Sequence, residues 1–233
     1  MNNVKKIFIT GCAKSGTTLL FRLCKSFEAD FTHGNEVNIS DFIHLAKSSK
    51  SNFFIGKRGG RALFSVCHVK KYRYIKIIKN NDIKILNIIR DGRDVVLSDN
   101  NYVSPKTWFC CMRQSRKFRD YIYYEVKYED LIRKPNRTQD RIAKKFGLTI
   151  KHKFSEYPNF VPDADFKLVE NKLRNKILVN PNEKEQVTTY RKRPLSFMSI
   201  GKDKYKKAYI KLCKNTKDRL DFEKELRLAG YIK

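Results

Sequence analysis

The apolar positions near the start of the chain change their spacing at two glycines. A short run rich in β-branched residues, 4–9, has the pattern of a buried parallel strand. After Gly11 and Gly16, apolar side chains recur every three or four residues, as on one face of a helix: Leu19, Leu20, Leu23, Cys24 and Phe27. The pattern therefore predicts a strand, a loop and a helix. Backbone N–H groups at such a helix N-terminus face a bound anion, which the helix dipole also favours.

Apolar runs and helical patterns alternate along the rest of the chain, which predicts an α/β fold with a parallel sheet flanked by helices. Further strands are expected over 29–33, 62–67, 83–89 and 123–128. Helices are expected over 41–47, 72–79, 105–121 and 204–228. A further helix is expected to end at Phe146. A basic glycine-rich turn is expected over 56–61, and a loop over 151–165.

Length and composition fit one folded domain over residues 1–233. Aromatic residues make up 12% of the chain and hydrophobic residues 41%, which favours a folded globule over a disordered chain despite the high charge. The 51 Lys and Arg outnumber the 24 Asp and Glu, giving a net charge of +27. Such a surface attracts polyanions, although a general lysine-rich bias gives the same excess without a specific partner.

The six cysteines show neither a C-x-x-C pair nor zinc-ligand spacing, so most are expected to be small core residues in a reducing compartment. The first strand begins almost at Met1, and its apolar stretch is too short for a signal peptide. No run of residues approaches the ~18 apolar positions that a membrane span requires. We therefore expect a soluble, cytoplasmic protein.

The residues of the first loop decide which anion it would hold. A nucleoside triphosphate P-loop with glycines at 11 and 16 needs lysine at position 17, but Thr17 stands there and Lys14 lies inside the loop. The run Gly-Cys-Ala-Lys-Ser-Gly-Thr-Thr instead resembles the 5′-phosphosulfate-binding loop of sulfotransferases that use 3′-phosphoadenosine 5′-phosphosulfate (PAPS). The resemblance implies a metal-free PAPS site and a sulfotransferase-like three-layer fold. The donor-binding residues that it implies here are Ala13, Lys14, Ser15, Gly16, Thr17 and Thr18.

A second motif follows the strand expected over 83–89. The segment from Arg90 to Ser98 resembles the 3′-phosphate-binding segment of the same sulfotransferases, with Gly92 where a proline is common. Arginine binds phosphate bidentately, and Ser98, expected two turns into the next helix, would add a hydroxyl donor. If the segment binds no phosphate, the alternative explanation is that it forms the charged start of a helix. The run Val-Lys-Tyr-Glu-Asp-Leu at 126–131 is also sulfotransferase-like and is expected to be architectural.

A basic segment near the carboxyl terminus folds over the nucleotide in many sulfotransferases. By this weaker resemblance, over about 190–205, Arg193, Ser199 and Lys202 are expected to contact the donor. The main resemblance covers about residues 4–148.

Two residues are candidate general bases. Glu36 follows the short strand expected over 29–33, at the distance from the loop where tyrosylprotein and several carbohydrate sulfotransferases carry a glutamate base. His68 ends the strand expected over 62–67, where cytosolic sulfotransferases carry a histidine base. Glu36 is modestly favoured.

The resemblance implies in-line transfer of a sulfuryl group from PAPS to an acceptor hydroxyl, with Lys14 stabilising the negative charge that develops. The expected acceptor is a carbohydrate or a tyrosyl or phenolic group, and an acidic glycan or peptide is a candidate for it. Nucleic acid is not expected as a substrate. Two alternatives stay open. One is a P-loop kinase or NTPase, and the other is a non-catalytic module that binds polyanions or nucleic acid through its positive charge.

Overall fold

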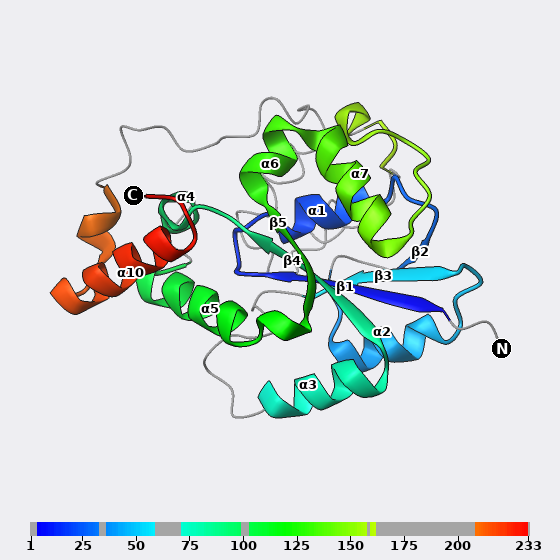
Figure 1. Cartoon of the computed structure of the whole chain (residues 1–233), viewed down its shortest axis with the longest axis horizontal. Helices are drawn as coiled ribbons and strands as arrows, with labels where there is room; N and C mark the ends of the chain where they lie inside the picture. Colours follow the sequence, from blue (N-terminus) through cyan, green and yellow to red (C-terminus); the bar gives the residue numbers. More distant parts are fainter. Residues whose placement is uncertain are drawn as a thin grey trace, which may run out of the picture.

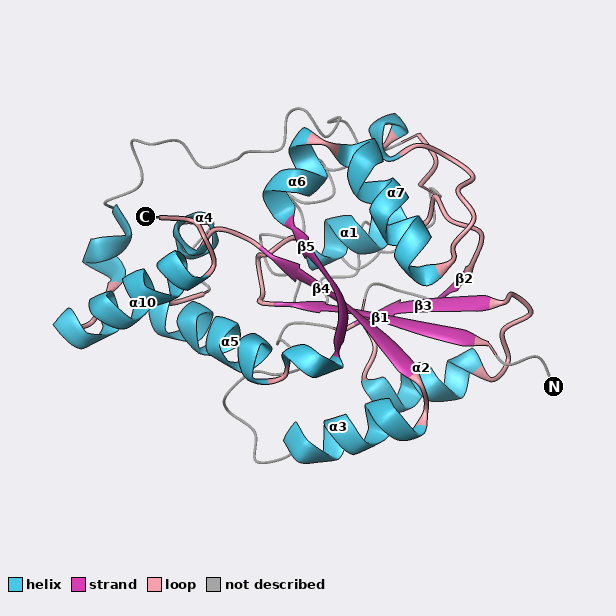
Figure 2. Cartoon of the chain, viewed as in Figure 1, coloured by secondary structure: helices cyan, strands magenta, loops and turns pink. Residues whose placement is uncertain are grey.

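A five-stranded parallel sheet forms the centre of the molecule (Figure 2). The computed structural model describes residues 4–32, 36–58, 71–98, 103–157, 159–161 and 208–232. In spatial order the strands are β2 (Asp30–Phe31), β3 (Phe53–Lys57), β1 (Lys5–Gly11), β4 (Ile83–Ile89) and β5 (Ile122–Lys127). The expected α/β class with a parallel sheet is confirmed.

Helices cover both faces of this sheet (Figure 1). Side chains alternate along β1, so Ile7 and Ile9 pack on one face and Phe8 on the other. On the first face lie α1 (Thr17–Cys24), α6 (Tyr128–Arg133) and α7 (Pro135–Phe146); on the second lie α2 (Ile39–Ala46) and α3 (Lys71–Asn80). The result is the expected three-layer arrangement.

A third cluster of buried side chains lies beyond β4, where α4 (Gly92–Val96), α5 (Pro105–Lys117) and α10 (Thr216–Leu228) meet. Trp108 is fully buried there, with its ring 4.9 Å from that of Phe222. A Cβ on Gly92 would lie 2.6 Å from the Trp108 ring. The close packing of Trp108 therefore explains why a glycine stands at position 92.

The strand between β2 and β1 does not lie where the sequence pattern indicated. The strand expected over 62–67 falls outside the described residues, whereas β3 spans Phe53–Lys57 and pairs with β1. Gly56 and Lys57, expected in a basic turn, are thus buried strand residues. A Cβ on Gly56 would lie 2.5 Å from the Phe42 ring, so the glycine lets α2 pack directly on the strand. This contact is tertiary and leaves no local sequence pattern.

Several helix boundaries also differ from the expectation. The helix after Arg90 ends at Val96 and does not reach Ser98. The helix expected over 105–121 ends at Lys117 and continues as the short helix η1 (Arg119–Tyr121). The described part of 204–228 consists of η5 (Ala208–Leu212) and α10, and the loop after α7 contains η2 (Phe154–Glu156). None of the helices within the described ranges is long and apolar enough to cross a bilayer.

Candidate active site

Parallel pairing brings the carboxyl ends of β1, β3 and β4 to one edge of the sheet. The loop after β1, Lys57 at the end of β3 and Arg90 after β4 therefore lie near one another. Ligands of open α/β sheets bind at this edge, where helix N-termini also point. The residues along it form the candidate site.

The loop from Gly11 to Gly16 turns sharply before α1 begins. Lys14 has a φ of 65° and Gly16 a φ of 94°, both left-handed, and the Ser15 amide donates to the Cys12 carbonyl across 3.1 Å. A side chain at Gly16 would be strained by this φ and would also lie 2.6 Å from the Tyr128 ring. The non-glycine Lys14 adopts a conformation that is costly for it, as happens at ligand-binding loops.

Ser15 tests whether this loop fits an anionic group. Its side chain is fully buried, and its Oγ makes no hydrogen bond to any of the described residues. Buried hydroxyls usually have a partner, so an acceptor oxygen of a bound group would satisfy Ser15. The loop and the start of α1 thus offer a hydroxyl and backbone donors to an anion such as a phosphosulfate.

Arg90 joins the two sequence motifs. Its Nη1 donates to the Lys14 carbonyl at 3.2 Å, and its guanidinium lies over the Tyr128 ring, 4.3 Å from the centroid. Its Nη2 is 3.9 Å from the Asp94 carboxylate. Tyr128 contacts both the loop glycine and the Arg90 guanidinium, so it fixes the spacing between the loop and the second motif. The guanidinium stands where it could bind an anion beside the loop.

Ser98 is differently placed from the expectation. Because α4 has already ended, the Ser98 side chain folds back and donates to the Val95 carbonyl at 2.7 Å. A contact between Ser98 and a donor phosphate stays a prediction, and it would require this hydroxyl to change partner.

Lys57 links the remaining parts of the site. Its side chain is only 1% exposed, and its Nζ donates to Thr18 Oγ1 at 2.7 Å and to Glu36 Oε1 at 3.2 Å. The amide of Val37 donates to the carbonyl of Lys57 at 2.9 Å, which holds the segment after β2 against the end of β3. One buried ammonium thus connects the candidate base to the helix that begins at the phosphate loop.

Burial lowers the pKa of Lys57 below its ordinary value, whereas the Glu36 carboxylate opposes that shift and Arg22 adds to it. An isolated buried ammonium is costly, and partial pairing offsets only part of that cost. Glu36 is half-exposed, with 52% of its side chain accessible, so the carboxylate can also meet a molecule arriving from solvent.

The first part of the chain matches a known family model. The model described as Sulfotransferase domain matches residues 4–110, a range that holds the loop, Glu36, Lys57 and Arg90. Residues 4–110 therefore match the sulfotransferase family. No curated protein matches this chain in a sequence search.

One solved structure supports the fold, and a second was also found. A mouse sulfotransferase, crystallised in complex with PAP, is 16% identical and superposes with a TM-score of 0.51, covering 96% of this chain and 84% of that one. A sulfotransferase from Alicyclobacillus acidocaldarius is 15% identical with a TM-score of 0.43, covering 79% of this chain and 90% of that one. At these identities the first of the two supports the fold alone.

The structure brings together some of the residues that the sequence predicted for this site, and others lie outside the described residues. Lys14, Thr18, Glu36 and Arg90 line one edge of the sheet, and Ala13 packs partly against the cluster around Trp108. His68, Arg193, Ser199 and Lys202 lie outside the described residues.

Sequence reasoning missed Lys57 and the support role of Tyr128. The missed signal was a lysine at the carboxyl end of a short apolar run, Phe53–Ile55. In a parallel sheet that position faces the ligand edge.

Proposed function

We propose that this sulfotransferase transfers the sulfuryl group of PAPS to the hydroxyl of an acceptor, with Glu36 as the general base. The observation that carries the proposal is the buried Lys57 ammonium, which contacts both the Glu36 carboxylate and Thr18 at the start of α1. It puts a base and a cation beside an anion-binding loop, which is the combination that sulfuryl transfer requires.

The donor half of the site consists of the loop and Arg90. The backbone donors of the loop, Ser15 Oγ and Lys14 would hold the 5′-phosphosulfate, while Arg90 would hold the 3′-phosphate. The mouse relative was crystallised with PAP, the desulfated form of this donor. Bound PAPS supplies an activated sulfuryl group, and the chain's residues orient it and neutralise charge. Ala13, Gly16, Thr17, Thr18, Ser98, Arg193, Ser199 and Lys202 complete the proposed donor-binding set.

The acceptor half consists of Glu36 and Lys57. Glu36 takes the proton of the acceptor hydroxyl as its oxygen forms a bond to sulfur and the bond from sulfur to the 5′-phosphate oxygen breaks. Lys57 and Lys14 stabilise the negative charge that grows on that leaving oxygen. A single well-placed donor of this kind lowers a barrier by about 3–4 kcal/mol. His68 is the alternative base.

The acceptor class follows from the base and the charge. A glutamate base is expected with sugar or tyrosyl hydroxyls, and the net charge of +27 favours an acceptor on an acidic glycan or peptide. A cytoplasmic location belongs to the same proposal.

Calorimetric titration with adenosine 3′,5′-bisphosphate, beside ATP with magnesium, tests the donor site. We expect magnesium-independent binding of the bisphosphate that Arg90→Ala and Lys14→Ala each weaken at least tenfold. Arg119→Ala, an exposed arginine on η1, is the matched control and should bind as the wild type does. Transfer of radiolabelled sulfate from PAPS to a panel of saccharide and tyrosyl acceptors then identifies the acceptor.

Other results of the same titration contradict the proposal. Binding of ATP with magnesium but not of the bisphosphate would favour a P-loop kinase or NTPase. Binding of neither nucleotide, with salt-sensitive binding of polyanions that is indifferent to Arg90→Ala, would favour a non-catalytic polyanion-binding module.

A further inference from the structure

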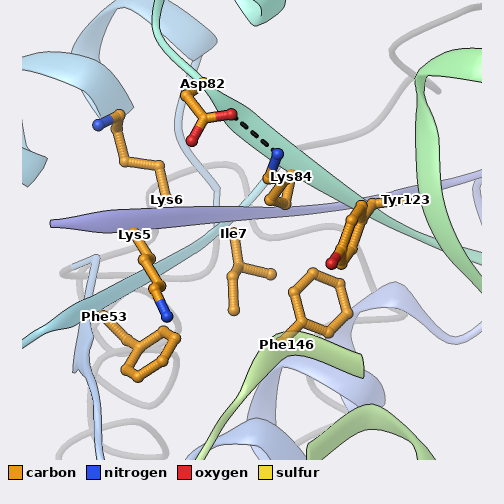
Figure 3. A pocket seen from close by; sticks show the side chains of 8 residues that line it. All are labelled: Lys5, Lys6, Ile7, Phe53, Asp82, Lys84, Tyr123 and Phe146. Carbon is orange, nitrogen blue, oxygen red and sulfur yellow. Dashed lines mark ion pairs between the residues drawn. The ribbon is translucent and has the colours of Figure 1, made fainter. Parts of the chain in front are cut away.

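A second pocket lies at the opposite edge of the sheet, where the strands begin. It encloses about 130 Å³, and its lining comes from the amino-terminal ends of β1, β3, β4 and β5 and from the last residue of α7 (Figure 3). Because the strands are parallel, the length of the sheet separates this pocket from the phosphate loop. It therefore plays no part in the proposed transfer.

The base of the pocket is apolar and aromatic. Ile7 lies between the rings of Phe53 and Phe146, with Tyr123 beside Phe146 (Figure 3). The rings of Tyr123 and Phe146 meet edge to face, with centroids 5.1 Å apart. Ile7, Phe53 and Phe146 are all buried, whereas Tyr123 is one of the few exposed large apolar side chains of the described residues, at 39%. The pocket thus leaves an aromatic surface open to a ligand.

Lysines gather around these rings. Lys5 Nζ lies 5.1 Å from the Phe53 centroid, while Lys84 and Lys145 place their ammonium groups 5.2 and 4.6 Å from the centroid of the same ring, Tyr123. Among the described residues that line the pocket, Asp82 carries the only carboxylate, and it pairs with Lys84 at 2.9 Å. Lys5, Lys6 and Lys84 line the pocket, and Lys145 adjoins it through the Tyr123 ring. These ammonium groups outnumber the one carboxylate and leave an excess of positive charge at the rim.

We propose that this pocket binds a small aromatic anion, an aryl sulfate or aryl carboxylate. The ring would rest on the apolar base, and the anionic group would lie among the ammonium groups of Lys5, Lys84 and Lys145. A dry cavity of about 150 Å³ accommodates benzene, so the volume suits one six-membered ring. A nucleotide, with a base, a sugar and a phosphate, is too large for the pocket. The ligand comes either as a free aryl anion or as a sulfated tyrosyl side chain of a polypeptide.

Titration with phenyl sulfate, followed by calorimetry and by saturation-transfer NMR, tests the site. We expect saturable binding that falls when salt is raised, because rim charges are screened. Phenol, which lacks the charge, and methyl sulfate, which lacks the ring, should each bind at least tenfold more weakly. An O-sulfotyrosyl peptide in a parallel titration separates the two sources: tighter binding than phenyl sulfate identifies a polypeptide ligand, and weaker binding identifies a free aryl anion.

Variants of the lysines test whether phenyl sulfate binds in this pocket. Lys84→Ala combined with Lys145→Ala should weaken phenyl sulfate at least tenfold, whereas Lys144→Ala, the exposed neighbour on α7, should leave it unchanged. Equal losses in Lys144→Ala and in the double variant would overturn the proposal, since the binding would then reflect general surface charge. A loss caused by Arg90→Ala, but not by the double variant, would also overturn it by placing the ligand at the phosphate loop. Neither readout depends on transferase activity.

Discussion

Lys57 Nζ lies 2.7 Å from Thr18 Oγ1, so the carboxyl end of β3 is tied to the first turn of α1 through a buried ammonium. The same nitrogen is 3.2 Å from Glu36 Oε1. A charge in this position is costly to bury, and its polar partners only partly compensate. Such an arrangement is typical of a functional group that a purely structural site would replace with an apolar side chain.

Replacing Lys57 with methionine should therefore separate activity from stability. We expect Lys57→Met to lower the transfer rate a hundredfold or more, because a donor near the developing charge is lost. The melting temperature should stay the same or rise, because the cost of burying the ammonium disappears. Steady-state kinetics and thermal melts measure the two effects. Lys47→Met, at an exposed lysine after α2, should change neither quantity. A lower melting temperature with unchanged turnover would show that Lys57 is structural.

Glu36 should affect catalysis without affecting donor binding. General-base catalysis contributes about 10²–10⁴-fold, so Glu36→Gln should lower kcat in that range. The dissociation constant of adenosine 3′,5′-bisphosphate should not change, because the loop and Arg90 bind it. Glu28→Gln, at an exposed glutamate away from this edge, serves as the control. If Glu36→Gln keeps full activity and His68→Ala loses activity, His68 and not Glu36 is the general base.

The sequence predicted the parts of the site that depend on local pattern. The strand, loop and helix around Lys14 and the strand before Arg90 are contiguous in sequence, and their apolar spacing indicates them directly. Parallel pairing of β1 with β4 then brings Lys14 and Arg90 together, as the order of the two motifs implied.

The contribution of β3 could not be predicted in the same way. Its apolar run, Phe53–Ile55, is short, and Gly56 is buried only because Phe42 from a distant helix packs on it. The sequence pattern consequently placed Lys57 in a basic turn. Ser98 was misplaced for a related reason: α4 ends at Val96, although the residues up to Ser98 continue a helical pattern.

The ring of Tyr128 should support donor binding through Arg90. A cation–π contact contributes roughly 0.5–2 kcal/mol, so Tyr128→Leu should raise the dissociation constant of adenosine 3′,5′-bisphosphate by about two- to thirtyfold. Tyr128→Phe keeps the ring at 4.3 Å from the guanidinium and should stay within twofold of the wild type. Calorimetry measures both variants. Wild-type affinity in Tyr128→Leu would show that Arg90 is positioned without the ring.

Glu129 should make stability depend on pH. Its carboxylate accepts a hydrogen bond from the Asp91 amide at 2.9 Å and one from the Tyr231 hydroxyl at 3.3 Å, which ties the end of the described chain to the start of α4. Burial nevertheless raises the pKa of Glu129 above its ordinary value. The folded state then holds its proton to a higher pH than the unfolded state does. The free energy of unfolding therefore falls as pH rises from the pKa of Glu129 in the unfolded state to its higher pKa in the folded state. Above the folded pKa, the loss of stability no longer changes with pH.

Glu129→Gln removes the titration while keeping an oxygen that can accept from the Asp91 amide. We expect its melting temperature, relative to that of the wild type, to rise between pH 4 and pH 7, by about 2–4 °C for each kcal/mol of burial cost relieved. Thermal melts across this range, with Glu28→Gln as the exposed control, give the difference curve. A difference that is flat with pH would mean that the hydrogen bonds to the Glu129 carboxylate balance the cost of burial, and one that falls would mean that they outweigh it.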